Sequence, residues 1–117
     1  MTSYRRFVRA KIQRLRVTDK NLRYEGSLEL DAALSRAAGM LPHELVQVVN
    51  VNNGERFETY IIDAPARSGA CVLNGAAARL GEIGDELIVM SIVIADEAGP
   101  GPAFVRVNVD AGNRVIE

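Results

Sequence analysis

Short runs of alternating apolar and polar residues dominate this chain, and alternation with a period of two is typical of half-buried β-strands. The first run covers residues 7–17, with apolar residues at even positions up to Ile12 and at odd positions from Leu15 onward. One extra residue near Gln13-Arg14 would account for this change of phase, and a β-bulge supplies one. The pattern therefore predicts a long first strand with a bulge in its second half.

Further runs predict strands of the same kind, and turn or cap residues separate them. Asn53-Gly54 is a strong hairpin signal between two of these runs. Asp31 is a suitable N-cap for a short helix over residues 32–38, and Gly39 is placed to end it. A polar run at residues 18–21 predicts a turn. Including the first, the predicted strands are 7–17, 27–30, 45–51, 55–62, 71–73, 86–95 and 104–109.

At 117 residues the chain is expected to form a single domain, 1–117. About seven short strands, joined by turns and one or two short helices, predict a mainly β barrel or sandwich with small helical connections. The second helical segment is expected over residues 74–78, where glycine and alanines allow the backbone to approach another element or a ligand closely. The prolines of segment 99–102 predict a linker.

Charge and hydropathy argue against several classes of function. The net charge is −1, which predicts no bulk attraction to nucleic acid or to an anionic membrane surface. Basic residues gather between Arg5 and Arg16, but apolar residues alternate with them. A strand with a basic face is therefore favoured over a nucleic-acid-binding arm. No apolar run approaches the length of a membrane span, and no signal-peptide core follows the basic start, so no membrane association is expected.

Cys71 is the only cysteine of the chain and His43 the only histidine. A lone cysteine forms no internal disulfide and is typical of a reducing compartment, so we expect a cytoplasmic protein. One residue of each type is too few for a zinc cluster, and the carboxylates lack the spacing of a calcium loop. No metal is therefore expected, and His43 is expected at the surface.

The pair Gly26-Ser27 is the candidate for unusual backbone chemistry. It lies between the short apolar segment 22–24 and the strand predicted from residue 27. A hydroxyl beside its own preceding carbonyl has an effective concentration of about 10⁵ M or more when well oriented. Glycine also reaches strained backbone angles at low cost. On these residues alone, a Gly-Ser pair most often forms an ordinary turn. Lys11 likewise fits a solvated charge on the polar face of its strand.

A set of short motifs occurs in one order along roughly residues 7–95, and together they carry a resemblance that none carries alone. They are Ala10-Lys11-Ile12, Arg16-Val17-Thr18, Leu22-Arg23-Tyr24-Glu25-Gly26-Ser27, Asn53-Gly54-Glu55-Arg56-Phe57, Thr59-Tyr60 and Asn74-Gly75-Ala76-Ala77-Ala78. In these residues the chain resembles the pyruvoyl-dependent aspartate 1-decarboxylases, the enzymes that make β-alanine for pantothenate biosynthesis. The similarity is looser in the C-terminal part.

The resemblance implies a fold, an assembly and a maturation step. The family folds as a double-psi β-barrel and forms a homotetramer with active sites between neighbouring subunits. Its members are proenzymes, which here implies self-cleavage between Gly26 and Ser27 into a β chain, 1–26, and an α chain, 27–117. Attack of Ser27 Oγ on the Gly26 carbonyl gives an ester, elimination leaves dehydroalanine, and hydrolysis yields a pyruvoyl group. Some members need a maturation factor for this step.

The resemblance also implies roles for individual residues. Ser27 becomes the pyruvoyl group, whose Schiff base with L-aspartate stabilises the carbanion left by CO2, in place of pyridoxal phosphate or a metal. Tyr60 is the proton donor and Thr59 assists self-processing and substrate binding. Lys11 and Arg56 bind the substrate carboxylates. The remaining residues of the expected pocket are Tyr24, Asn74, Gly75, Ala76 and Ala77.

The chain departs from the family pattern mainly around the substrate. Gln13 stands where a histidine is usual, which removes any acid–base role of that side chain. Glu58 stands where a smaller or uncharged residue is typical, and it either faces Arg56 and Tyr60 or points to solvent. Arg79 replaces another common histidine. Two alternatives therefore stay open: a paralogous pyruvoyl decarboxylase acting on a different amino acid, and an unprocessed double-psi barrel that serves as a binding module.

Overall fold

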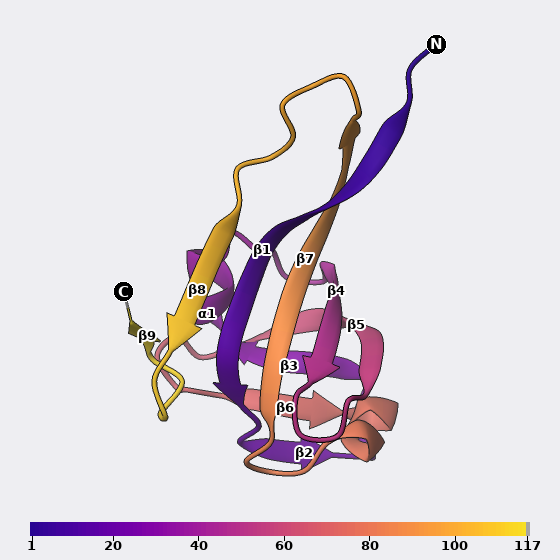
Figure 1. The fold of residues 1–117 in the computed structure, drawn as a ribbon. Coiled ribbons are helices and arrows are strands. Elements are labelled where there is room, and N and C mark those ends of the chain that lie inside the picture. Colours follow the sequence, from indigo (N-terminus) through magenta and orange to yellow (C-terminus); the bar gives the residue numbers. More distant parts are fainter. Residues whose placement is uncertain (117) are drawn as a thin grey trace.

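The computed structural model describes residues 1–116, which form nine strands, one α-helix and one 3₁₀-helix (Figure 1). In chain order these elements are β1 (Tyr4–Arg16), β2 (Asp19–Asn21), β3 (Ser27–Asp31), α1 (Ala32–Ala37), β4 (Leu45–Asn50), β5 (Arg56–Ala64), β6 (Cys71–Asn74), η1 (Gly75–Leu80), β7 (Glu86–Asp96), β8 (Val105–Val109) and β9 (Val115–Ile116). The predicted fold class is confirmed, because strands dominate and the helical connections are short.

The strands follow the order β2-β6-β3-β5-β4-β7-β1-β8-β9. The two longest strands, β1 and β7, pair antiparallel and stand upright in the centre of Figure 1. Parallel pairs join β3 to β5, β2 to β6 and β1 to β8, whereas the other pairs are antiparallel. Strands that are distant in the sequence therefore lie side by side. This mixture of pairings is consistent with a double-psi barrel.

The predicted bulge in the first strand is confirmed. The register of β1 against β7 shifts between Ile12 and Leu15, and Arg14 has a φ of 65°. A left-handed backbone is uncommon for a residue other than glycine and marks a local irregularity in the strand. A second register shift, between Val8 and Ala10, was not predicted. The bulge near Arg14 keeps both Ile12 and Leu15 buried despite the change in sequence phase, whereas Val8, which precedes the other register shift, is 38% exposed.

The predicted turn at residues 18–21 is partly wrong, because Asp19–Asn21 form the short strand β2. Its residues pair in parallel with β6, with Asp19 opposite Val72. Polar residues of this kind have low strand propensity, so the neighbouring strand and not the local sequence determines their conformation. In contrast, the local signals around α1 are confirmed. Asp31 accepts a hydrogen bond from the Ala33 amide at 2.8 Å, and Gly39 follows the helix with a φ of 69°.

Apolar side chains from most of the strands form one core. Ile12, Leu28, Val48, Leu73 and Val89 come from five different strands and are all 0% exposed. Fully burying such a side chain stabilises the fold by about 1.5–3 kcal/mol relative to leaving it exposed. The core therefore fixes the strands that carry the residues discussed below.

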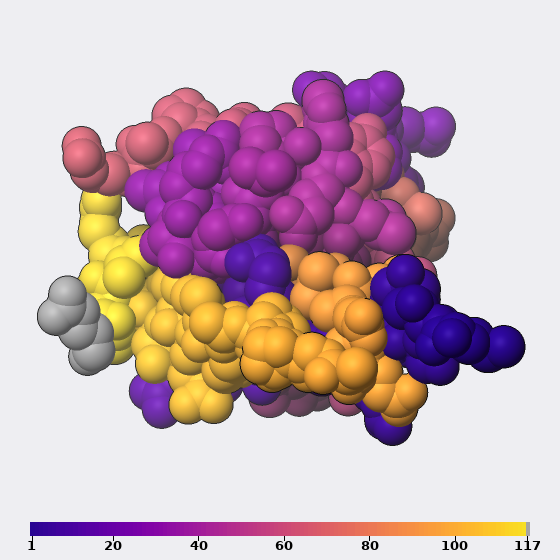
Figure 2. All heavy atoms as spheres, turned by 90° about the horizontal axis from the view of Figure 1, so that it is seen from above, coloured from indigo at the N-terminus to yellow at the C-terminus, as the bar shows by residue number. Residues whose placement is uncertain are grey.

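The first residues of the chain extend away from this core. Tyr4 pairs with Asp96, and the Glu97 amide donates to the Ser3 carbonyl, so the N-terminus lies beside the end of β7. Figure 2 shows this end of the molecule protruding, with the N-terminal residues in indigo. Within residues 1–116, no helix has the length and apolar character needed to cross a membrane.

Candidate active site

Ser27 is fully buried at the start of β3, and two groups hold its hydroxyl. Ser27 Oγ donates to the Glu25 carbonyl at 2.9 Å and accepts from Asn74 Nδ2 at 3.1 Å. Asn74 reaches it because β3 and β6 pair antiparallel with these two residues directly opposite each other. The hydroxyl therefore points back along the chain toward the residues that precede Ser27, and not toward solvent.

The backbone of η1 presses closely on the residues before Ser27. Gly75 has a φ of 66°, and a Cβ atom there would lie 2.6 Å from Gly26 Cα and 3.0 Å from the Tyr24 carbonyl oxygen. No side chain fits in that space, so Gly75 is the glycine that this contact requires. Gly26 itself has open space around the position of a Cβ and no left-handed φ. The expectation that Gly26 uses glycine's conformational freedom is therefore wrong for the uncut chain.

A hollow of about 330 Å³ lies beside Gly26. Its walls come from β5 and η1, so the structure brings together several of the residues that the sequence singled out. The lining residues are Gly26, Phe57, Glu58, Thr59, Ala76, Ala77 and Leu80, and all of them except Glu58 and Leu80 belong to the sequence motifs. The volume is at the lower end of the range for small-molecule sites, as a substrate of amino-acid size needs.

Thr59 and Tyr60 are neighbours in sequence but lie on opposite faces of β5, because side chains alternate along a strand. Thr59 shares its face with Phe57 and Ile61, which contact or belong to the core. Tyr60 lies on the other face, opposite Leu45 of β4, and its ring packs edge-on against His43 at 5.9 Å. The predicted surface position of His43 is confirmed.

Burial and the neighbouring Glu25 carboxylate both raise the pKa of the Tyr60 phenol, burial more than the hydrogen bond and charge of Glu25. A phenol with a raised pKa is protonated at neutral pH, although it is also a weaker acid than an ordinary phenol. Glu25 is two residues before Ser27, which means that Tyr60 lies next to the segment that the hydroxyl faces. The sequence reasoning missed Glu25, although its position beside Gly26 was a usable signal.

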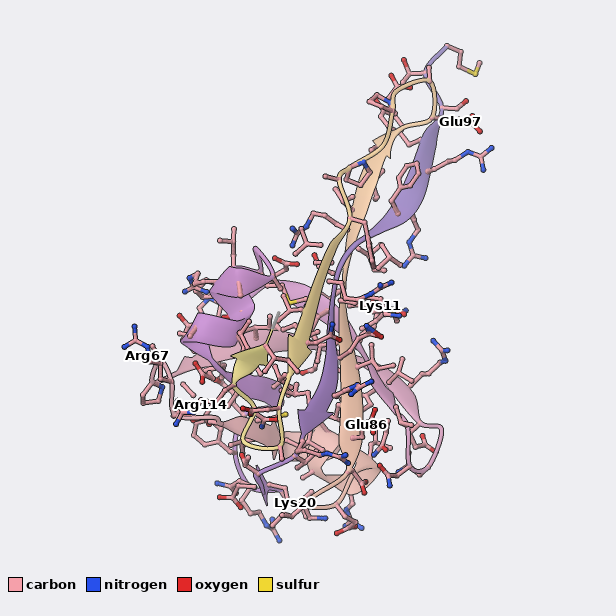
Figure 3. All side chains as sticks on the ribbon, turned by 60° about the vertical axis from the view of Figure 1, so that its left-hand side comes forward. Lys11, Lys20, Arg67, Glu86, Glu97 and Arg114 are labelled. Carbon is pink, nitrogen blue, oxygen red and sulfur yellow. The ribbon has the colours of Figure 1, made fainter. Side chains whose placement is uncertain are left out.

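The structure keeps Lys11 away from the hollow. Lys11 pairs with Met90, Met90 with Gln47, and Gln47 with Glu58, so these residues form one row across four strands. Three steps between neighbouring strands correspond to about 14 Å between the backbones of Lys11 and Glu58. Figure 3 shows Lys11 about halfway along β1. Within one chain, Lys11 is therefore not brought together with Thr59.

Arg56 lies at the exposed start of β5, opposite Val49. It is on the same face as Glu58 and Tyr60, but among residues 1–116 it forms no ion pair with Glu58. Glu58 instead lies at the rim of the hollow with its side chain exposed. This answers the question about its orientation that the sequence left open.

The other departures from the family pattern lie outside the hollow. Gln13 Nε2 lies 3.5 Å from Asn108 Oδ1 on β8, and Arg79 is exposed on η1. Tyr24 is exposed as well, and only its backbone carbonyl lies near Gly75. Cys71 is fully buried, which raises the pKa of its thiol to about 12 and leaves it unreactive at neutral pH.

One further acidic residue belongs to the site. Asn74 Nδ2 lies 3.3 Å from Glu29 Oε1 as well as bonding Ser27, so the Glu29 carboxylate helps to orient the amide. The alternation of β3 already places Glu29 on the same face as Ser27, and this was the signal that could have found it. Among residues 1–116, no three His, Cys, Asp or Glu side chains gather as a metal site would require.

Comparison with known proteins agrees with this geometry. The family model described as aspartate decarboxylase matches residues 3–116. The aspartate 1-decarboxylase of Kosmotoga olearia is 54% identical over 106 residues, covering 89% of this chain and 91% of that protein. The aspartate 1-decarboxylase of Acaryochloris marina is 51% identical over 115 residues, covering 97% and 88%. The resemblance read from the short motifs is thereby confirmed, and the chain belongs to the aspartate decarboxylase family.

Proposed function

We propose that this chain is an aspartate 1-decarboxylase that cuts itself between Gly26 and Ser27 and converts L-aspartate into β-alanine and CO2. The observation that carries the proposal is the buried Ser27 hydroxyl, held by Asn74 Nδ2 and directed toward Glu25, in a chain of this family. β-Alanine made in this way serves pantothenate biosynthesis.

Self-cleavage needs only groups that the chain supplies, together with water. Ser27 Oγ adds to the Gly26 carbonyl carbon, the C–N bond breaks, and an ester replaces the amide. Elimination then releases residues 1–26 with the Gly26 carboxylate and leaves dehydroalanine at position 27. Hydrolysis of dehydroalanine releases ammonia and leaves a pyruvoyl group at the start of the chain 27–117. The close contact between Gly75 and Gly26 holds the scissile bond in place for the first step.

The residues around Ser27 fit such a group. The hollow beside Gly26 has room for a small substrate next to the new chain end, and Gly75, Ala76 and Ala77 present no bulky side chain there. A pyruvoyl group supplies the electron sink that stabilises the carbanion left when CO2 departs, which no ordinary side chain does. Thr59 lines the same hollow, where its hydroxyl is available to the scissile carbonyl before cleavage and to substrate afterward.

Tyr60 is the proton donor in this proposal. Its raised pKa keeps the phenol protonated across the neutral range, and its contact with Glu25 puts it beside the cleavage segment. After cleavage, Glu25 belongs to the fragment 1–26 and Tyr60 to the fragment 27–117, so the two residues are no longer part of one continuous chain. Tyr60 then returns a proton to the carbon that lost CO2.

Lys11 and Arg56 bind the two carboxylates of aspartate, and the proposed site is completed between copies of the chain. Since Lys11 lies about 14 Å across the sheet from the rim of the hollow, we propose that a neighbouring copy brings its Lys11 to the site. Arg56 suits the other carboxylate, because its guanidinium binds two oxygens at once.

Exposed apolar residues on the outer side of the sheet support a homotetramer. Leu45 is 61% exposed, Ile94 68% and Val8 38%, and they come from the adjacent strands β4, β7 and β1. Exposed apolar side chains that lie close together mark an interaction surface. Because the chain has one cysteine, which is free and buried, the proposed compartment is the reducing cytoplasm.

The first test is the intact mass of the purified protein. We expect two fragments, residues 1–26 with a free carboxylate and residues 27–117 with a pyruvoyl-blocked start. A chain that stays whole and inactive, alone and with cell extract, contradicts the proposal and favours an unprocessed binding module. Cleavage only with extract identifies a requirement for a maturation factor.

The shared site has its own test in mixed tetramers. Ser27→Ala chains are expected to be inactive alone, and Lys11→Ala chains to turn over slowly alone at an aspartate concentration near the wild-type KM. Coexpressed, they regain part of the wild-type rate, because some sites then receive an intact Lys11 and an intact Ser27 from different chains. No recovery in tetramers proved to be mixed means that one chain supplies both residues.

A different amino acid substrate is the second candidate, and Glu58 is the observation that favours it. Its carboxylate lies exposed at the rim of the hollow, where it repels an anionic substrate. CO2 release from a panel of acidic, neutral and basic amino acids decides between them. A higher kcat/KM for a neutral or basic amino acid than for aspartate establishes the alternative.

A further inference from the structure

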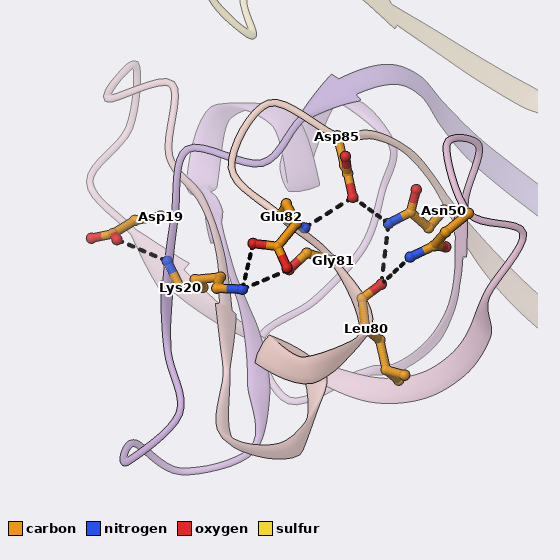
Figure 4. Close-up of polar contacts among 8 residues, drawn as sticks. Asp19, Lys20, Asn50, Leu80, Gly81, Glu82 and Asp85 are labelled. Carbon is orange, nitrogen blue, oxygen red and sulfur yellow. Dashed lines mark hydrogen bonds and ion pairs between the residues drawn. The ribbon is translucent and has the colours of Figure 1, made fainter.

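The far end of η1 is held by side chains from two other parts of the chain. Asn50 and Asn53, from the β4–β5 hairpin, both donate to the Leu80 carbonyl at 3.1 Å. Lys20, from β2, donates to the Gly81 carbonyl at 3.1 Å (Figure 4). The last carbonyls of a helix have no partners within the helix, so these donors satisfy groups that would otherwise be free.

Asn50 is the centre of this arrangement. It is 0% exposed, and its Nδ2 also donates to Asp85 Oδ2 at 2.9 Å, while its Oδ1 accepts from the Asn52 amide. Asp85 Oδ2 in turn accepts from the Glu82 amide (Figure 4). Asn50 therefore joins the hairpin, the end of η1 and the turn before β7 through one buried side chain.

The N-terminus of η1 lacks a side-chain capping hydrogen bond. Asn74 occupies the N-cap position but makes no capping hydrogen bond to the helix. Its amide instead bonds Ser27 Oγ and Glu29, and the next residue, Gly75, packs on Gly26. The six residues of η1 thus connect the cleavage site at one end to Asn50 at the other, and Ala76, Ala77 and Leu80 line the hollow between them.

We propose that Asn50 is a positioning residue for self-cleavage: by fixing Leu80, it keeps Asn74 and Gly75 against Ser27 and Gly26. The inference rests on the proposed function. Asn50 does not line the hollow, and its side chain bonds Leu80, Asp85 and the Asn52 amide, so it acts on the cleavage site through η1. Asp85 holds the Asn50 amide in the orientation that points its Nδ2 at Leu80.

Asn50→Ala tests this directly. We expect the folded variant to cut itself about tenfold more slowly, the factor associated with loss of about one hydrogen bond's net stabilisation. Intact mass against time measures the rate. In a Ser27→Ala background, which stays uncut, Asn50→Ala should also speed amide hydrogen exchange at residues 74–81.

Asn52→Ala is the matched control from the same hairpin. It removes the acceptor of the Glu86 amide hydrogen bond, whereas the hydrogen bonds from the hairpin to η1 come from Asn50 and Asn53. Its cleavage rate should stay within about twofold of wild type, as expected for a change outside the site. If Asn52→Ala slows cleavage as much as Asn50→Ala does, general destabilisation is the cause and the inference fails.

A swap of the two side chains separates positioning from stability. Asn50→Asp with Asp85→Asn restores a hydrogen bond between positions 50 and 85 but turns a carboxylate toward the Leu80 carbonyl. We expect the melting temperature of the double variant to return toward that of the wild type, while its cleavage rate stays as low as that of Asn50→Ala. Recovery of both overturns the inference, because the bond to Leu80 would then be unnecessary.

Two further outcomes are decisive. If Asn50→Ala does not fold, Asn53→Ala takes its place, because Asn53 is exposed and is the other side-chain donor to the Leu80 carbonyl. An unchanged cleavage rate in Asn53→Ala then overturns the inference. If the wild-type chain does not cut at all, the proposed function fails. The exchange comparison in the Ser27→Ala background tests the link between Asn50 and η1 independently of cleavage.

Discussion

The two faces of β5 differ in whether one chain brings together all the residues proposed to act on that face. On the inner side, the proposed cleavage region (Gly26, Ser27, Thr59, Asn74 and Gly75) surrounds a buried hydroxyl whose two hydrogen bonds are both made within one chain. On the outer side, the proposed substrate face (Lys11, Arg56, Glu58 and Tyr60) is divided between β1 and β5, with Arg56 and Glu58 exposed and Lys11 and Tyr60 half-buried.

The difference follows from what each region has to do. The proposed self-cleavage breaks a bond within the chain, so the reacting groups have to be in place once the chain has folded. Holding a free amino acid requires charged groups that become oriented only around the substrate, and a neighbouring copy is proposed to supply one. The cleavage region should therefore respond to substitution through the rate of maturation, and the substrate face through turnover and KM.

The largest expected effect is that of Ser27→Ala. Without the hydroxyl no ester forms, so the chain stays whole and CO2 release falls to background. Intact mass and a CO2 assay measure both. Ser35→Ala is the matched control, since Ser35 is also a buried serine but its hydroxyl bonds Ala32 and Arg36 of α1. Cleavage at Gly26 in the Ser27→Ala chain would exclude Ser27 as the nucleophile.

Tyr60→Phe should separate the two faces most clearly. The variant is expected to mature normally, because the phenol lies on the outer face, yet kcat should fall by about 10²–10⁴-fold, as for loss of a general acid. Pre-steady-state titration of the pyruvoyl ends corrects the rate for the mature fraction. A variant that matures normally and turns over normally would contradict the assigned role.

The same residue predicts a pH dependence for the wild-type enzyme. Because burial and Glu25 raise the pKa of Tyr60 above its ordinary value of 10.0, the acid form persists through neutral pH. The limb of kcat that depends on Tyr60 should therefore fall only above about pH 10. Loss of that limb in Tyr60→Phe is the check, and an unchanged limb would assign it to another group.

Arg56→Ala and Lys11→Ala should raise the KM for aspartate with little effect on maturation. Loss of one hydrogen bond to a charged group corresponds to about a 10- to 100-fold change. Arg67→Ala is a suitable control, because Arg67 is an exposed arginine in the loop between β5 and β6. If either variant slows cleavage as strongly as it raises KM, the two regions are not separate.

Glu58→Gln should have the smallest effect. Removing an exposed negative charge at the rim of the hollow is expected to lower the KM for aspartate by about two- to fivefold, the size typical of a screened surface charge. The effect should shrink in high salt, which a salt titration of KM measures. A higher KM for aspartate in this variant would mean that Glu58 helps to bind the substrate. Such a role is expected if the natural substrate is a neutral or basic amino acid.

Local sequence patterns determined much of the fold. Seven of the nine strands, the bulge near Arg14, the N-cap at Asp31 and the Asn53-Gly54 hairpin depend on residues close together in the chain, so the sequence alone predicted them. The short motifs also led to the family and to Ser27. These features could be read because periodicity and turn chemistry act over only a few residues.

Tertiary structure decided what depends on distant pairings. Asp19–Asn21 became a strand only because β6 lies beside it, and Gly75, not Gly26, proved to be the glycine that close packing requires. Ser27 meets Asn74 across 47 residues of sequence, and Lys11 lies three strands away from Glu58. The sequence by itself identified the residues that are proposed to carry the chemistry. Only strand order and register decided which of them meet in one chain, because contacts across a sheet depend on the whole fold.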